Sequence, residues 1–355
     1  MLEIGLRKLS FTQSKVDRCL CIKKDVLVVT YVDDTIIWSP HESKINKTIR
    51  KLKDLNFELT DEGDVDSFLG IQINNLENKS FKMTQPALIK TIVETIGLSL
   101  DDSKQHKTPA VNPPLQPYPD SRPSTETYSY RSVIGMLTYL ARMTRPDIEY
   151  AVHQCARFQI NPKIPHYNAI KRIGRYLIAT QDKGIIFKPD NNLTEVICYV
   201  DADFAGNYDK EYSDDPCSVK SRSGCIILYA NCPLIWYSRL QTEIALSTTE
   251  AEYIALSQGT REVLPIRSLL LELNEILELP KSNMVIKCTV FEDNQSAKEL
   301  AICPKNRPRT KHIAVKYHHF REHVAKGIIH VKHTPTTEQL ADIFTKPLTL
   351  NVFEY

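Results

Sequence analysis

Apolar and polar residues follow two different periods along this chain. Short β-branched runs with a period of about two residues predict strands, and these runs cover residues 196–200, 224–229, 234–238, 285–291 and 328–332 together with a hairpin over 25–38. Segments whose apolar residues recur every three or four positions predict helices, and these cover residues 44–60, 86–98, 130–140, 145–152, 169–177, 312–325 and 336–346.

From about residue 193 the predicted elements follow the order strand, hairpin, helix, strand, helix, strand and helix. The hairpin turns across residues 230–233. The first of these helices begins at a capping box, Ser247 to Glu250, in which the serine accepts a first-turn N–H and the glutamate reaches back. Another helix begins at Asn294. Three antiparallel strands followed by alternating helices and strands predict an α/β domain with a five-stranded mixed sheet and flanking helices.

Composition adds limits to this pattern. At 355 residues the chain is long enough for about two or three compact units. Six prolines between residues 101 and 125 predict an extended linker there. The net charge of +2 gives no sign of a polyanionic partner, but residues 305–332 carry eight basic residues and one acid. Such a stretch can follow phosphates, although a solvated helix face is the simpler interpretation.

The cysteines and the apolar segments bear on the compartment. Nine scattered cysteines without a CxxC pair indicate a reducing environment. No apolar run has the length of a secretory leader or a membrane span. We therefore expect a soluble intracellular protein that does not contact a membrane.

Carboxylates stand at the end of the first strand of the five-stranded sheet and on the following helix. Asp201 ends the strand, and Asp203 lies on the same face by the two-residue period. Glu252 shares a helix face with Ala255 and Leu256, where an unpaired carboxylate is costly. A bound metal offsets this cost, and so does a salt bridge.

Two further aspartates complete a candidate set. Asp293 follows an apolar strand and precedes a helix, so it can be either a metal ligand or a helix N-cap. Asp342 lies in the last predicted helix, where exposed aspartates are common. Together with Asp201 and Glu252 they form a set of hard oxygen ligands that suits Mg²⁺ or Mn²⁺.

A second acidic pair, Asp33 and Asp34, lies at the tip of the N-terminal hairpin in the sequence Tyr-Val-Asp-Asp. Turn chemistry alone accounts for aspartates at such a position. However, Tyr-Val-Asp-Asp between two apolar strands is also a specific motif, so a functional role is the alternative.

These motifs jointly resemble the Pol polyprotein of Ty1/copia-type retrotransposons. The resemblance rests on residues 11–15, 31–34, 68–73, 130–132, 144–147, 166, 199–206, 247–256, 292–296 and 338–346. It implies the C-terminal part of a reverse-transcriptase palm (α+β) with thumb-like helices over 1–100. A Pro-rich linker and helical connection over 101–192, a ribonuclease H-like domain over 193–347 and a tail over 348–355 would follow.

The resemblance also implies roles for the acids. Asp201, Glu252, Asp293 and Asp342 match the four metal-ligand positions of the family's ribonuclease H, which holds two Mg²⁺ or Mn²⁺ ions. Asp203 and Glu250 are expected outside this set. His333 matches a mobile histidine that aids proton transfer or product release, but a plain surface histidine is an equal alternative.

For the polymerase, the resemblance implies Mg²⁺ binding by Asp33 and Asp34. The family also needs a third aspartate after an upstream strand, and the only earlier acids here are Glu3, Asp17 and Asp25. We therefore expect no RNA-directed DNA polymerase activity from this chain alone.

Several residues are candidates for nucleic-acid contact, namely Gly70, Asn294, Arg309, Lys311 and His312. Gly70 lies in the segment that would steady the primer end, and the basic residues would contact an RNA/DNA hybrid. His319 and His323 stand one helical turn apart, which can indicate zinc, but no third ligand is evident.

The expected function is two-metal hydrolysis of the RNA strand of RNA/DNA hybrids. One alternative is a decayed, non-catalytic remnant that still binds nucleic acid, and another is a full reverse transcriptase if coding sequence continues upstream of Met1. Expected partners are the hybrid, template–primer and other Pol parts such as integrase. The expected location is the cytoplasm, in virus-like particles, the nucleus, or both.

Overall fold

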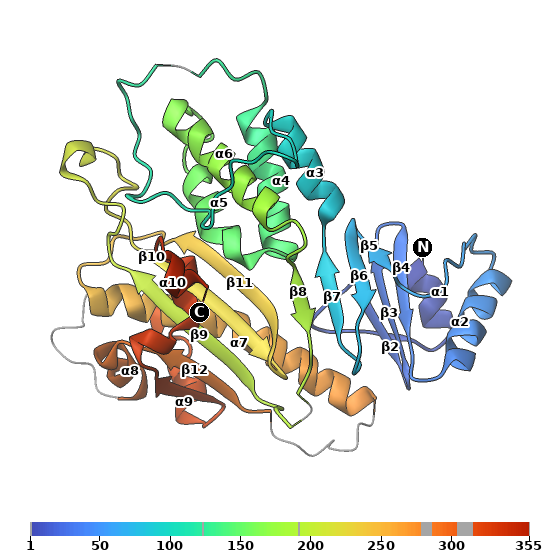
Figure 1. Cartoon of the computed structure of the whole chain (residues 1–355). Coiled ribbons are helices and arrows are strands. Elements are labelled where there is room, and N and C mark those ends of the chain that lie inside the picture. The colour runs from blue at the N-terminus through green and yellow to red at the C-terminus, as the bar shows by residue number, and fades with distance from the viewer. Residues whose placement is uncertain (1, 123, 191, 278–285, 304–314, 355) are drawn as a thin grey trace. The chain divides into compact units, whose positions relative to one another are not determined.

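The computed structural model describes residues 2–122, 124–190, 192–277, 286–303 and 315–354 (Figure 1). The chain forms two compact units. The first joins Met1–Leu69 with Glu262–Ile286, and the second joins Gly70–Arg261 with Lys287–Tyr355. None of the described helices combines the length and the apolar character needed to cross a membrane.

The first unit contains an antiparallel sheet in the order β1-β2-β3-β4. Its elements are α1 (Leu2–Lys8), β1 (Thr12–Gln13), β2 (Leu20–Lys23), β3 (Val26–Tyr31), β4 (Asp34–Trp38), α2 (Glu42–Asp54) and β5 (Ser67–Phe68). The predicted hairpin is confirmed as β3 and β4. The helix predicted over 44–60 is too long, because the left-handed backbone of Asn56 (φ 63°) ends α2.

The helices of the second unit pack into one apolar cluster. They are α3 (Pro86–Thr95), α4 (Tyr130–Met143), α5 (Glu149–Ala156) and α6 (Ile164–Ala179). Their apolar stripes interlock through residues that are almost fully buried, such as Ile92, Leu137, Ala151 and Ile170. The predicted helical block is thus confirmed, and the described part of the linker over 101–125 forms neither helix nor strand.

A small antiparallel sheet in this unit was not predicted. It includes β6 (Ile71–Asn75), β7 (Phe81–Thr84) and β8 (Ile185–Phe187). The motif over 68–73 is not one continuous strand, since Leu69 and Gly70 both have positive φ values (52° and 74°) and β6 begins only at Ile71. β7 and β8 lie far apart in sequence, and their pairing is fixed by a stack of Phe81 on Phe187 with ring centroids 4.8 Å apart.

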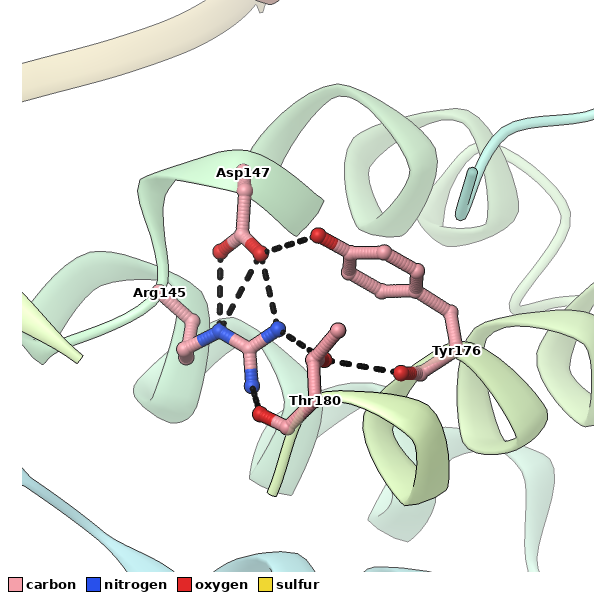
Figure 2. A network of polar contacts seen from close by, with 4 residues as sticks. All are labelled: Arg145, Asp147, Tyr176 and Thr180. Atoms are coloured by element: carbon pink, nitrogen blue, oxygen red, sulfur yellow. Dashed lines mark hydrogen bonds and ion pairs between the residues drawn. The ribbon is translucent and has the colours of Figure 1, made fainter. Parts of the chain in front are cut away.

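One buried ion pair holds the helical block together (Figure 2). The Arg145 side chain is 1% exposed, and its Nη2 lies 2.7 Å from Asp147 Oδ2. Arg145 Nη1 donates to the carbonyl of Thr180 (3.0 Å), and the hydroxyl of Tyr176 donates to Asp147 Oδ2 (2.6 Å). The guanidinium therefore satisfies a carbonyl at the end of α6 and links it to the segment that leads into α5.

The large sheet of the second unit has the order β11-β10-β9-β12-β13. Its strands are β9 (Val196–Asp203), β10 (Arg222–Tyr229), β11 (Cys232–Leu240), β12 (Cys288–Glu292) and β13 (Ile329–His333). β9, β10 and β11 are antiparallel neighbours, and β12 runs parallel to both β9 and β13. This confirms the predicted five-stranded mixed sheet, with β9 at its centre. The hairpin turn is shorter than predicted, since Cys232 and Pro233 already belong to β11.

The part of helix α7 (Thr248–Ile276) that belongs to the second unit, residues 248–261, packs on β9 of this sheet. It approaches closely at Gly259, where an added Cβ would lie 2.4 Å from Cγ1 of Val200 and 3.2 Å from Sγ of Cys198. Only a residue without a side chain fits between helix and strand at this distance.

The helix predicted from Asn294 is confirmed as α8 (Gln295–Ile302), whose N-cap is Asn294. The elements after it depart from the predicted helices. They are the 3₁₀ helix η4 (Val315–His318), α9 (Arg321–Ala325), the 3₁₀ helices η5 (Thr336–Glu338) and η6 (Leu340–Phe344), and α10 (Leu350–Phe353). The helix predicted over 312–325 starts outside the described residues, and its described part is split into η4 and α9. The helix predicted over 336–346 is wrong. Gln339 has an extended backbone (ψ 98°) and its Nε2 donates to the carbonyl of Val200 (2.9 Å).

Replacing Arg145 by Met should destabilise the protein by about 2 kcal/mol, because the partly buried Asp147 would lose its counter-ion and Thr180 would lose its donor. Chemical denaturation of the full chain measures the loss. The matched control is Arg131→Met on the exposed side of α4, which should unfold like the wild type. Equal stability of the two variants would contradict the structural role of the ion pair.

Candidate metal centre

Three carboxylates of the second unit meet at one edge of the large sheet. Oxygen atoms of Asp201, Glu252 and Asp293 all lie within 4.8 Å of one another. Asp201 comes from β9, Glu252 from α7 and Asp293 from the residue after β12. Asp201 and Glu252 are 3% and 5% exposed, so both carboxylates are removed from water. Three predicted ligands are thus brought together from three separate elements.

Glu252 owes its position to the start of α7. Ser247 Oγ accepts the N–H of Glu250 (3.2 Å), which is half of the predicted capping box. The other half differs, because Glu250 Oε2 accepts from the N–H of Leu246 rather than Ser247 (2.8 Å). Glu250 therefore accepts a backbone hydrogen bond at the start of the helix. Glu252 lies in the first turns of the same helix and faces the sheet.

Asp293 is not a helix cap. The N-cap of α8 is Asn294, whose Oδ1 accepts from the N–H of Ala297 (3.0 Å). Asp293 Oδ2 accepts a hydrogen bond from the hydroxyl of Thr336 (2.8 Å). The capping alternative for Asp293 is therefore wrong, and its carboxylate is held by a residue of η5.

Asp342 lies beside this group but outside the three-residue cluster. Lys346 connects it to Asp201, since Lys346 Nζ is 2.9 Å from Asp342 Oδ1 and 4.0 Å from Asp201 Oδ2. The hydroxyl of Thr345 donates to Asp201 Oδ2 and also to the carbonyl of Asp342. The end of η6 thus supplies one carboxylate, one ammonium and one hydroxyl to the site.

The electrostatics of the group favour a cation. Burial, partly offset by Lys346, raises the pKa of Asp201 to about 7. Burial and the neighbouring carboxylates of Glu292 and Asp201 raise the pKa of Glu252 to about 11. Among the described residues, no hydrogen-bond partner reaches the buried Oε2 of Glu252. The donor set and this orphaned oxygen fit a hard divalent ion such as Mg²⁺ or Mn²⁺.

Sequence reasoning missed a fifth acid, Glu292. It is fully buried at the end of β12, and its Oε1 accepts from the N–H of Asn294 (3.0 Å). Burial raises its pKa well above the usual range. The two-residue period of β12 placed it on the same side as Cys288 and Val290, which was the available signal. Lys346 was also missed as part of the site.

The structure places the other predicted residues of the second unit outside the cluster. His333 is exposed at the end of β13, opposite Glu292 in the strand register. Asp203 continues the face of Asp201, but it does not join the three-residue group. Gly70 is exposed with φ 74°. Arg309, Lys311 and His312 lie outside the described residues.

The remaining predicted sites form no metal cluster within the described part of the chain. Asp33 and Asp34 are both exposed at the tip of the hairpin in the first unit. His319 and His323 do not share one helix, because His319 precedes α9. The zinc alternative therefore lacks the helical geometry on which it depended.

Comparisons with known proteins find a reverse-transcriptase family model and Pol polyproteins of transposons. A family model described as reverse transcriptase (RNA-dependent DNA polymerase) matches residues 1–112. The chain is 34% identical over 98% of its length to the retrovirus-related Pol polyprotein from transposon RE1 of Arabidopsis thaliana, covering 23% of that protein. It is 30% identical over 98% of its length to the corresponding polyprotein from transposon TNT 1-94 of Nicotiana tabacum, covering 26%. The chain thus spans about a quarter of these relatives.

Among solved structures, the chain is similar to the N-terminal RNase H domain of rv2228c from Mycobacterium tuberculosis. The identity is 14% and the TM-score is 0.29, over 42% of this chain and 90% of that chain. The likeness is weak at these values, and the arrangement of the sheet is established by its own strand pairing.

Removing the charge of Asp201 should stabilise the protein when divalent ions are chelated. The pKa of Asp201 in the folded protein is about 7, above the ordinary value of an aspartate. The folded state therefore loses stability as the pH rises from the ordinary pKa to about 7, because the buried carboxyl group must ionise. Asparagine does not ionise, so Asp201→Asn should be more stable than the wild type by about 2 kcal/mol at pH 8. The gain should vanish near pH 4 in thermal unfolding.

The exposed Asp33→Asn variant is the control and should match the wild type at both pH values. A loss of stability in Asp201→Asn that is equal at pH 4 and pH 8 would show that the Thr345 hydrogen bond outweighs the repulsion between carboxylates.

Proposed function

The chain belongs to the Pol polyproteins of Ty1/copia-type retrotransposons, and on this premise we propose that its five-stranded domain is a metal-dependent ribonuclease H. Its substrate would be the RNA strand of an RNA/DNA hybrid. The observation that supports this proposal most directly is the meeting of Asp201, Glu252 and Asp293 within 4.8 Å. Three carboxylates at such separation repel one another, and a bound cation would offset this repulsion.

The residues of the site would have two roles, to bind the metal ions and to orient the ligands. Asp201, Glu252, Asp293 and Asp342 would hold two Mg²⁺ or Mn²⁺ ions. When bound, such ions supply an activated water and stabilise the charge on the leaving 3′ oxygen. Thr345 holds one oxygen of Asp201 and Thr336 holds one oxygen of Asp293. These hydroxyls would fix the carboxylates in the orientation that binding needs.

Residues around the cluster would handle the substrate and the proton. His333 is exposed at the end of β13 and can exchange a proton with a product or with water near the site. We propose that Asn294 contacts the hybrid beside Asp293, with Arg309, Lys311 and His312 on its phosphates. Discrimination between RNA and DNA would use the 2′-hydroxyl groups in the minor groove.

The reverse-transcriptase part is proposed to be inactive as a polymerase in this chain. Asp33 and Asp34 are exposed on one hairpin, and the described residues near them include no third carboxylate at metal-binding distance. A palm site with two of its three acids would bind Mg²⁺ weakly. Template–primer binding, with Gly70 near the primer end, and association with other Pol parts such as integrase are further proposals. The proposed location is intracellular, in virus-like particles of the cytoplasm, in the nucleus, or both.

The ribonuclease proposal predicts cleavage of a 5′-labelled RNA strand in an RNA/DNA hybrid with Mg²⁺ or Mn²⁺. Asp293→Asn should lower the rate at least about 100-fold, because metal-bound charge stabilisation contributes several kcal/mol. Asp33→Asn is the matched control in the other acidic pair and should cleave normally. Hybrid binding without cleavage would instead support a non-catalytic remnant.

The polymerase proposal predicts that the same protein will not extend a labelled primer on an RNA template with deoxynucleotides and Mg²⁺. A gel assay at single-nucleotide resolution measures this directly. Extension that Asp33→Asn abolishes would show that two acids suffice, and the proposal would be wrong.

A further inference from the structure

A lysine is built into the proposed metal centre. The ammonium of Lys346 lies between two carboxylates, 2.9 Å from Asp342 Oδ1 and 4.0 Å from Asp201 Oδ2. The side chains of Asp201 and Asp342 are 4% and 13% exposed, and that of Lys346 is 38% exposed. The lysine therefore neutralises part of a largely buried negative charge while its own side chain is only partly buried.

The short turn at the end of η6 fixes this arrangement. Lys346 follows Asp342 by four residues, and the N–H groups of Thr345 and Lys346 both donate to the carbonyl of Asp342 (3.1 and 3.3 Å). Lys346 also lines a small cavity with Tyr150 and Phe353. The turn thus places Lys346 four residues after Asp342, where its ammonium reaches both carboxylates.

The lysine divides the carboxylates of the site into two groups. Asp201, Glu252 and Asp293 form the cluster within 4.8 Å, and Lys346 is not paired with Glu252 or Asp293 in the described residues. Asp342 is outside that cluster and shares the ammonium with Asp201. A cation held by the cluster leaves the Lys346–Asp342 pair in place, whereas a cation between Asp201 and Asp342 must displace it.

We propose that Lys346 competes with the second divalent ion for Asp201 and Asp342, so that the two ions bind in a set order and with unequal affinity. This inference rests on the proposed two-metal function. The first ion would bind tightly to Asp201, Glu252 and Asp293. The second would bind weakly, because it would have to displace an ammonium that is already ion-paired with Asp342, and because a nearby positive charge repels it.

Titration of the full chain with Mn²⁺, followed by the electron paramagnetic resonance of free Mn²⁺, tests this without any activity measurement. Wild-type protein should bind one ion tightly and a second weakly. Lys346→Met should tighten the second site by about tenfold or more, since the competing charge is gone, and leave the first site unchanged. Lys346→Arg keeps the charge and should keep the weak second site.

Lys326→Met is the matched control, because Lys326 also pairs with an acid four residues away, Glu322, but on the exposed surface of α9. It should bind Mn²⁺ like the wild type. Lys346→Gln provides a second neutral variant if Lys346→Met fails to fold, as judged by circular dichroism.

The outcomes separate the two proposals. If the second ion binds equally to wild type and to both neutral variants of Lys346, the competition is wrong while the metal centre stands. If wild type binds no Mn²⁺ tightly, or if Asp293→Asn binds the first ion as tightly as wild type, the metal centre itself is wrong and the competition falls with it.

Discussion

Repulsion among buried carboxylates is the constraint around which the second unit is arranged. Asp201 and Glu252 are almost fully removed from water, and Asp293 and Glu292 lie beside them. Each acid that the fold keeps in this place needs a donor nearby. Thr345 serves Asp201, Thr336 serves Asp293 and the N–H of Asn294 serves Glu292. Buried oxygens of Glu252, Glu292 and Asp342 have no hydrogen-bond partner among the described residues, and of these three acids Glu252 is the one in the three-residue cluster.

The strand pairing of the sheet fixes where these carboxylates lie. β9 occupies the centre, pairs antiparallel with β10 and parallel with β12, and so brings Asp201 beside the end of the strand that precedes Asp293. Parallel neighbours end at the same edge of a sheet, which is why residues so far apart in sequence meet. The final 3₁₀ turns close the site from the other side through the bond from Gln339 to Val200.

The sequence allowed the main architecture and much of the site to be predicted, because these depend on local patterns. The five strands followed from period-two runs, and the acids followed from motifs that each lie within one element. Errors arose where distant contacts decide the outcome. The 3₁₀ turns after Pro335 depend on Val200, and the small sheet depends on pairing between β7 and β8. Glu292 was missed because a buried acid in a strand has no sequence signal apart from its period. Lys346 was missed because only the folded turn brings its ammonium to Asp201.

Gly259 determines how closely helix α7 approaches the sheet near the carboxylate cluster. It stands on the same face of α7 as Glu252, two helical turns away, and allows the helix to rest directly on Val200. Protein interiors resist compression, so the spacing between helix and sheet at this contact also sets how far Glu252 stands from Asp201. Mg²⁺ requires nearly ideal octahedral distances of about 2.0–2.1 Å, a tolerance of tenths of an ångström. Under the proposed metal-dependent function, the choice between ions at this edge would therefore depend partly on a residue that never touches them.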